Sequence, residues 1–176
     1  MSITIRYAGA PRLIRTLWGE VGFEELTNGV LVAGQPNGSP SWFPCDDHPS
    51  SKASYRTTIS TDSPYYALAA GELLARRVRA GQTVWTYEQP EPTSTYLATL
   101  QIGMYAAHRL PKAPVAMQAV LPDRLWPNFE HDFARQKAMM KLFIKLFGPY
   151  PFAGGYTVVV TEDELEIPLE AQGVSI

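Results

Sequence analysis

Histidine and cysteine, the side chains used most often to bind zinc, are rare in this sequence. The chain contains three histidines and one cysteine, at His48, His108, His131 and Cys45. A common zinc-binding pattern places two histidines four residues apart on a helix, with a glutamate directly after the first. No two histidines here have that spacing, and none is followed by glutamate. We therefore predict no catalytic residue, no metal site and no bound cofactor in this chain.

Cys45, Gln35 and Glu170 each have a structural interpretation that follows from the neighbouring sequence. A single cysteine excludes an intrachain disulfide, and we expect Cys45 to pack as a small apolar side chain. Glu170 closes an acidic run over residues 162–170, which favours a solvated carboxylate. Gln35 precedes a proline, which favours a loop amide that bonds to nearby backbone groups. The residues alone assign no chemistry to any of the three.

Residues 34–55, GQPNGSPSWFPCDDHPSSKASY, form a long, turn-rich connection. Closely spaced prolines and glycines restrict or free the backbone, and the Asp and Ser side chains can bond to their own backbone. A loop this long in a compact domain is usually functional or disordered. Trp42 and Phe43 argue against disorder, because solvated linkers rarely carry such residues. Composition alone favours a packed Ω-type loop with apolar anchors, and a binding loop is the alternative.

Composition limits the class of protein. The 176 residues suffice for one domain, or for a small domain and part of another, and 45% hydrophobic with 18% charged residues is typical of a soluble globular chain. The net charge of −2 gives no reason to expect nucleic acid or an anionic membrane as partner. No apolar run reaches membrane-spanning length, and the N-terminal residues lack signal-peptide features. We expect a cytoplasmic protein.

Short alternating segments predict strands through the first two thirds of the chain. The expected strands cover residues 3–7, 30–33, 54–60, 65–70, 72–78, 83–88 and 95–105. Asn28-Gly29 marks a turn, and Pro90 and Pro92 should end the strand before them. Strands separated by turn signals at these intervals indicate a sandwich-like antiparallel β domain.

The pattern changes near residue 111. Residues 113–120 and 156–160 read as apolar strands. Between them, apolar residues from Phe129 onward recur at three- and four-residue steps, which predicts one helix with Asn128 as N-cap and Gly148 as its stop. The predicted fold is thus mainly β, a sandwich-like antiparallel domain over 1–110, followed by a short α/β strand-helix-strand segment over 111–176.

Several motifs in this order resemble the aminopeptidase N family of zinc metallopeptidases, which includes the leukotriene hydrolases. The motifs are QP at 35–36, FPCDDHP at 43–49, KASY at 52–55, a tryptophan-containing strand and its continuation at 83–105, KLFGPYPF at 145–152 and YTVVV at 156–160. The fixed spacing of the motifs over 35–55 is specific, and the resemblance covers roughly residues 30–172.

The resemblance implies a function for the parent enzyme and roles for two residues. Family members remove N-terminal residues from peptides with a zinc-activated water, and the chain would cover the later N-terminal β domain (1–110) and the start of the catalytic domain (111–176). Gln35 falls where the family binds the substrate's free amino end. Glu170 matches the Glu of the family's Gly-x-Met-Glu-Asn motif, where a carboxylate selects an α-ammonium. Here Ile167 and Pro168 replace the small residues before the Met position, and Ala171 replaces Asn.

The chain lacks the family's zinc motif, so we expect it to be inactive alone, with zinc bound elsewhere in the parent. Expected partners are peptide substrates in the parent and either the remainder of that chain or another copy through open β edges. An alternative is a non-catalytic β interaction module that docks a partner chain. A third interpretation is an unrelated sugar- or peptide-binding β domain that uses Trp42 and Trp85, but alternating aromatics more often form a core.

Overall fold

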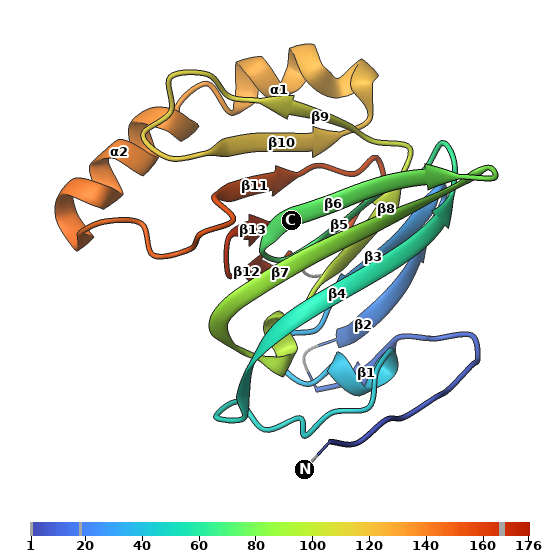
Figure 1. The fold of residues 1–176 in the computed structure, drawn as a ribbon. Helices are drawn as coiled ribbons and strands as arrows, with labels where there is room; N and C mark the ends of the chain where they lie inside the picture. The colour runs from blue at the N-terminus through green and yellow to red at the C-terminus, as the bar shows by residue number, and fades with distance from the viewer. Residues whose placement is uncertain (1, 18, 166–167) are drawn as a thin grey trace.

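A computed structural model describes residues 2–17, 19–165 and 168–176 (Figure 1). The described chain contains three sheets and two α-helices. The first sheet is antiparallel, in the order β1-β2-β3-β8-β5. Its strands are β1 (Ile14–Thr16), β2 (Gly19–Leu26), β3 (Gly29–Ala33), β8 (Leu100–Gly103) and β5 (Tyr66–Ala69). The β2–β3 hairpin turns at Thr27 and Asn28, which confirms the turn predicted there.

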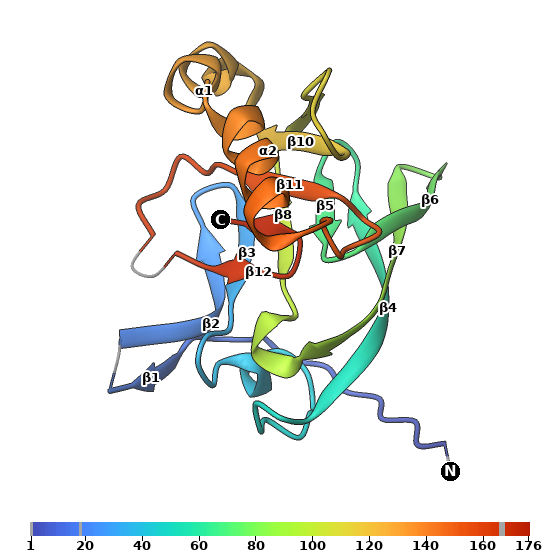
Figure 2. The same ribbon diagram turned by 90° about the vertical axis from the view of Figure 1, so that its left-hand side faces the viewer.

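The second layer of the sandwich is a three-stranded antiparallel sheet in the order β4-β7-β6. It consists of β4 (Lys52–Asp62), β7 (Gln82–Ser94) and β6 (Glu72–Arg79). Figure 2 shows this layer facing the sheet that contains β2, β3 and β8. The mainly β fold with antiparallel sheets is confirmed.

Strand β7 continues through Pro90 and Pro92, so the prediction that these prolines end it was wrong. Pairing with β6 stops at Glu88, and beyond that point β7 pairs with β4 alone. The β4–β7 register also shifts between Ala53 and Tyr55, opposite the prolines. A strand edge next to a bulge tolerates residues that cannot donate a backbone hydrogen bond.

The third sheet is mixed, in the order β12-β13-β11-β10-β9. It contains β12 (Glu170–Ala171), β13 (Val174–Ser175), β11 (Tyr156–Val159), β10 (Met117–Leu121) and β9 (Ala106–Arg109). Strand β11 runs parallel to both β10 and β13, as expected when a helical crossover joins β10 to β11. The predicted strand-helix-strand segment is therefore present, although β10 is shorter than the predicted strand over 113–120.

The crossover contains two helices instead of the single predicted one. They are α1 (Trp126–Asp132) and α2 (Gln136–Phe147), and α2 ends at Gly148 as expected. Asn128 lies within α1 and caps neither helix, because α1 begins two positions earlier at Trp126, with Pro127 in its first turn, where proline is tolerated. The rings of Phe129 and Phe133 stack on each other with their centroids 4.6 Å apart. Both pack against the sheet face that carries Ala119 and Val158.

Two further strand predictions failed for identifiable reasons. Residues 3–7 form no strand: Ile3 and Ile5 are 71% and 58% exposed, and within the described ranges the segment has no pairing partner. In the predicted strand over 95–105, residues Thr95–Leu97 form the 3₁₀ helix η2, and only β8 is extended. The turn is needed because β7 and β8 belong to different sheets.

An apolar cluster centred on β7 joins the sandwich to the third sheet. Trp85 and Tyr87 of β7, both at most 2% exposed, share this cluster with residues of β10, β11 and β13. The contributing residues of the third sheet are Val120, Val159 and Val174. The predicted domain division at residues 110–111 stays a prediction, and the core runs across it. No described helix is long and apolar enough to span a membrane.

Candidate functional site

The loop over residues 34–51 folds back on strand β2. Its first turn is closed by the Gly38 amide, which donates to the Gly34 carbonyl over 2.7 Å. The 3₁₀ helix η1 (Ser39–Ser41) follows, and the Ser41 hydroxyl oxygen accepts a hydrogen bond from the Phe23 amide over 2.9 Å. The backbones meet so closely that a Cβ on Gly38 would lie 2.7 Å from the amide nitrogen of Gly22.

Apolar and polar contacts then attach the loop to the sandwich. Phe43 makes edge contacts with Trp42 and Tyr55, with ring centroids 4.7 and 6.5 Å apart. The Thr95 hydroxyl donates to the Asp47 carboxylate over 3.1 Å. The Ser94 hydroxyl donates to the Pro49 carbonyl over 2.7 Å. The prediction of a packed loop with apolar anchors is confirmed, and Asp47 has a structural role in it.

Gln35 is exposed at the point where this loop leaves β3. The preceding residue, Gly34, has no room for a side chain, because an added Cβ would lie 3.0 Å from the Tyr96 carbonyl oxygen. The following peptide bond, to Pro36, is cis. The Gln35 side chain is therefore presented to solvent directly after a closely packed backbone position.

Glu170 is the first residue of β12 and is also exposed. Its Oε1 accepts a hydrogen bond from the Ser175 hydroxyl over 2.7 Å, across the β12–β13 pair. The preceding residue, Leu169, is completely buried. Because side chains alternate along a strand, burying Leu169 turns the Glu170 carboxylate outward. Ile167, which departs from the family motif, lies outside the described residues.

The structure brings the two backbone segments together. Ala33, two residues before Gln35, and Leu169, next to Glu170, share one apolar cluster with Leu26 and Leu31. Figure 2 shows β12 beside β3 accordingly. Among the described residues no hydrogen bond joins the Gln35 and Glu170 side chains. They are two exposed polar groups on neighbouring segments that share this cluster.

The described residues do not provide a zinc site. Within residues 2–17, 19–165 and 168–176, no three His, Cys, Asp or Glu side chains converge. Each histidine has a local contact instead. His48 Nδ1 lies 2.7 Å from the Ser50 hydroxyl, His131 Nδ1 lies 2.8 Å from Asp132, and the His108 ring stacks on Trp126 at 4.2 Å. The donor side chains of the described residues therefore do not fit a zinc ion. The expectation that this chain binds no zinc stays a prediction.

Part of the acidic run has a structural role that its sequence did not reveal. Asp163 Oδ1 accepts hydrogen bonds from the Thr27 amide over 3.0 Å and from the Thr27 hydroxyl over 2.6 Å. Glu162 forms an ion pair with Arg124. The Thr27 bonds attach the segment after β11 to the β2–β3 turn, far away in sequence, and the Arg124 ion pair attaches it to the 3₁₀ turn after β10. The two hydrogen bonds from Thr27 lower the pKa of Asp163.

The Asp163 contact predicts a pH-dependent contribution to stability. A lowered folded-state pKa means that the carboxylate stabilises the fold above the ordinary Asp pKa of about 4, and that this contribution is lost as pH falls through the lower folded-state value. We expect Asp163→Asn to lower the free energy of unfolding near neutral pH, with a smaller deficit at about pH 3. Urea unfolding at both pH values measures this. Glu130→Gln, at an exposed position in α1, controls for charge loss, and an equal deficit at both pH values would contradict the prediction.

Comparisons with known proteins identify a matching family and similar sequences. Residues 28–97 match the Peptidase M1 N-terminal domain family. The chain is 25% identical over 81 residues to Aminopeptidase M1 of Arabidopsis thaliana. The aligned segment covers 46% of this chain and 9% of that protein. It is 27% identical over 85 residues to Leucyl aminopeptidase of Saccharolobus solfataricus, and that aligned segment covers 48% of this chain and 11% of that protein.

Solved structures show the same fold over nearly the whole chain. The M1 zinc metallopeptidase of Deinococcus radiodurans superposes with a TM-score of 0.83 at 23% identity, over 96% of this chain and 40% of that one. A mutant of that enzyme bound to a Tyr-Ser-Ala substrate superposes with a TM-score of 0.84 at 22% identity, again over 96% and 40%. The chain thus spans about a tenth of the matched curated relatives and two fifths of these structures.

Residues 28–97, which match the Peptidase M1 N-terminal domain family, form part of the sandwich to which the mixed sheet is appended. The resemblance to the aminopeptidase N family of zinc metallopeptidases is confirmed.

Proposed function

We propose that this chain is the N-terminal part of a zinc metallo-aminopeptidase that removes N-terminal residues from peptides. The observation that carries the proposal is the match of residues 28–97 to the Peptidase M1 N-terminal domain, within a fold shared over 96% of the chain. Residues 1–110 would form the later N-terminal β domain, and residues 111–176 would begin the catalytic domain. Zinc, bound by other residues of the parent, would activate the hydrolytic water.

In this proposal Gln35 and Glu170 bind the α-ammonium group of the peptide. Both are exposed, and both extend from supports fixed by the cluster around Ala33 and Leu169. Ser175 donates to one carboxylate oxygen of Glu170, which orients the group and leaves the other oxygen for a ligand. A carboxylate bonded to an ammonium group gives a charge-assisted hydrogen bond, which would favour peptides with a free N-terminus.

The alternative is a non-catalytic module that docks a partner chain. The observation that favours it is the outer face of α2, where Leu142, Phe143, Leu146 and Phe147 are 51%, 47%, 61% and 82% exposed. The remainder of a longer aminopeptidase chain could cover the same face. Both proposals therefore expect further polypeptide at α2, and they differ in whether it is covalently continuous with this chain.

One experiment separates the two proposals. We expect the native polypeptide carrying this sequence, recovered from its own cells, to have an intact mass several times 19.5 kDa and to hydrolyse leucine 4-nitroanilide. The 176-residue chain supplied with zinc should release no 4-nitroaniline, because its described donors do not converge on a metal. A native mass near 19.5 kDa would instead support the docking module, and enzyme-like turnover by the short chain would contradict both.

A further inference from the structure

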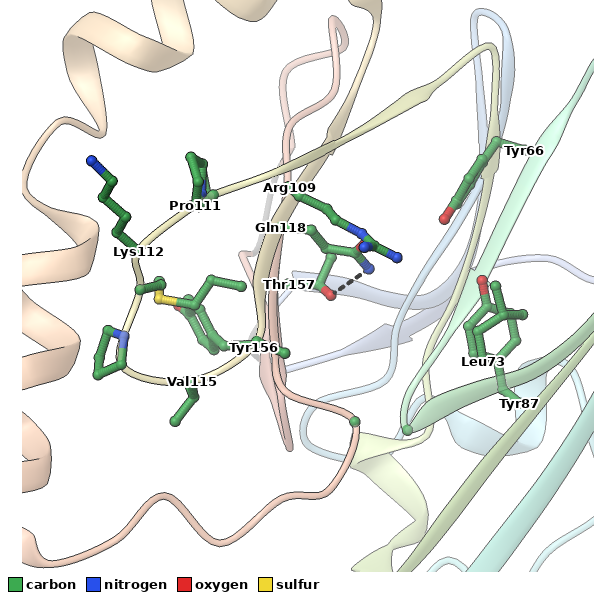
Figure 3. A pocket seen from close by; sticks show the side chains of 17 residues that line it. Tyr66, Leu73, Tyr87, Arg109, Pro111, Lys112, Val115, Gln118, Tyr156 and Thr157 are labelled. Atoms are coloured by element: carbon green, nitrogen blue, oxygen red, sulfur yellow. Dashed lines mark hydrogen bonds between the residues drawn. The ribbon is translucent and has the colours of Figure 1, made fainter.

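A cavity of about 850 Å³ lies between the sandwich and the third sheet, and neither Gln35 nor Glu170 lines it (Figure 3). Tyr66, Leu73 and Tyr87 form its sandwich side. Strands β9, β10 and β11 form the opposite side, and the loop over residues 110–116 forms its end. Its volume is in the range of small-molecule sites, which often lie where two structural units meet.

Arg109 supplies positive charge to this cavity. Figure 3 shows its guanidinium group extending from β9 into the space between Gln118 and Tyr66, whereas the Lys112 side chain extends away from that space. No Asp or Glu is among the described residues that line the cavity, and Arg109 forms no ion pair within the described part of the chain. A guanidinium group is always charged and presents a planar set of donors that matches a carboxylate.

Neutral hydrogen-bonding groups surround the guanidinium group. The Gln118 side-chain amide donates to the Thr157 hydroxyl over 3.0 Å, which fixes its orientation and leaves a second N–H available. The Tyr66 hydroxyl faces this region from the sandwich, whereas the Tyr87 hydroxyl donates to the Ala67 carbonyl over 2.8 Å (Figure 3). Burial raises the pKa of both tyrosines, so both stay protonated at neutral pH. The Gln118 amide and the Tyr66 hydroxyl can therefore contact an anion without adding negative charge.

The remaining walls are apolar, and the end loop is conformationally restricted. Leu73, Val115 and Met117 contribute apolar surface. Pro111 and Pro114 restrict the loop, and Lys112 between them has a φ of 60°, a conformation unusual for a residue other than glycine. Strained backbone residues of this kind are often found at ligand-binding sites. The cavity therefore combines one cation, oriented neutral donors and an apolar surface.

We propose that this cavity binds a small organic carboxylate with a flat apolar body, with the carboxylate on Arg109 and Gln118 and the apolar body against Tyr66, Leu73 and Val115. The proposal uses no residue of the proposed aminopeptidase site. Because its two walls belong to the sandwich and the third sheet, the ligand would contact both units.

The probe for this site is 3-phenylpropionate, compared with its neutral analogue 3-phenylpropanamide. In an amide-resonance NMR titration of the chain, we expect saturable shifts at residues lining the cavity, with a Kd for the acid of about 1 mM or lower. The acid should bind roughly tenfold more tightly than the amide, because only the acid pairs with the guanidinium group.

Arg109→Gln should remove this preference: affinity for the acid falls about tenfold and affinity for the amide is unchanged. Arg77→Gln, at an exposed arginine of β6 that does not line the cavity, is the matched control and should bind like the parent. The acid and amide comparison on the unmutated chain needs no variant to fold. Equal binding of acid and amide, shifts away from the cavity, or no saturation by about 10 mM would each overturn the proposal.

Discussion

Replacing Gly154 with alanine is expected to lower the free energy of unfolding of this chain by about 2–3 kcal/mol. Gly154 precedes β11, and its backbone lies directly against that of Gly71, between β5 and β6. An added Cβ would overlap the Gly71 carbonyl group and lie 2.8 Å from the Glu72 amide nitrogen. Backbone atoms cannot rotate away as a flexible side chain can, so the sandwich and the third sheet would have to separate.

Urea unfolding of the two chains measures this effect. Gly9→Ala is the matched control, because nothing lies within 4 Å of a Cβ there and the residue is exposed. This variant measures the effect of replacing a glycine where the added Cβ meets no clash. Its free energy of unfolding should lie within about 0.5 kcal/mol of the parent's. If Gly154→Ala and Gly9→Ala unfold at the same urea concentration, the close contact between the two units does not stabilise the fold.

The second large effect is expected at Glu170 in the longer, active polypeptide. Glu170→Gln should lower kcat/KM for peptides with a free N-terminus by about 10- to 100-fold, since a neutral amide forms a weaker hydrogen bond to an ammonium group than a carboxylate does. Preference for these peptides over N-acetylated ones should fall in parallel. Steady-state kinetics on the two peptide classes provides both values.

Two matched variants make the Glu170 result specific. Glu164→Gln removes another exposed carboxylate of the same acidic run and should leave kcat/KM unchanged. Ser175→Ala removes the hydroxyl that donates to Glu170 and should have a smaller effect in the same direction, because the carboxylate remains. A Glu170→Gln enzyme with unaltered selectivity for free N-termini would contradict the proposed role while leaving the family assignment intact.

Local sequence pattern predicted the elements whose pairing follows from that pattern. Strands β3, β4 and β11 and the stop at Gly148 appear as expected. The failures depended on which strands become neighbours. Residues 3–7 alternate but have no pairing partner within the described ranges, and Pro90 is tolerated because β7 has lost one neighbour at that point. One-dimensional periodicity does not contain this information.

The candidate site shows the same limit. The loop around Trp42 and Phe43 was predicted as packed from its composition alone, and it is packed. The roles proposed for Gln35 and Glu170 come from family resemblance and not from residue type. The hydrogen bonds between Thr27 and Asp163 join positions 136 residues apart, and the Arg109 cavity is assembled from β5, β6, β7, β9, β10 and β11. Neither leaves a local signal in the sequence.

The cluster around Trp85 has a consequence for biosynthesis. Trp85 belongs to the sandwich, yet its cluster also includes Val174, close to the end of the described chain. At typical translation rates, roughly 5–20 s pass between synthesis of these two positions. During that interval the nascent sandwich carries Trp85, Tyr87 and Leu68 without their partners from β10, β11 and β13. We therefore expect the emerging chain to bind chaperones that recognise apolar segments until β13 has left the ribosome.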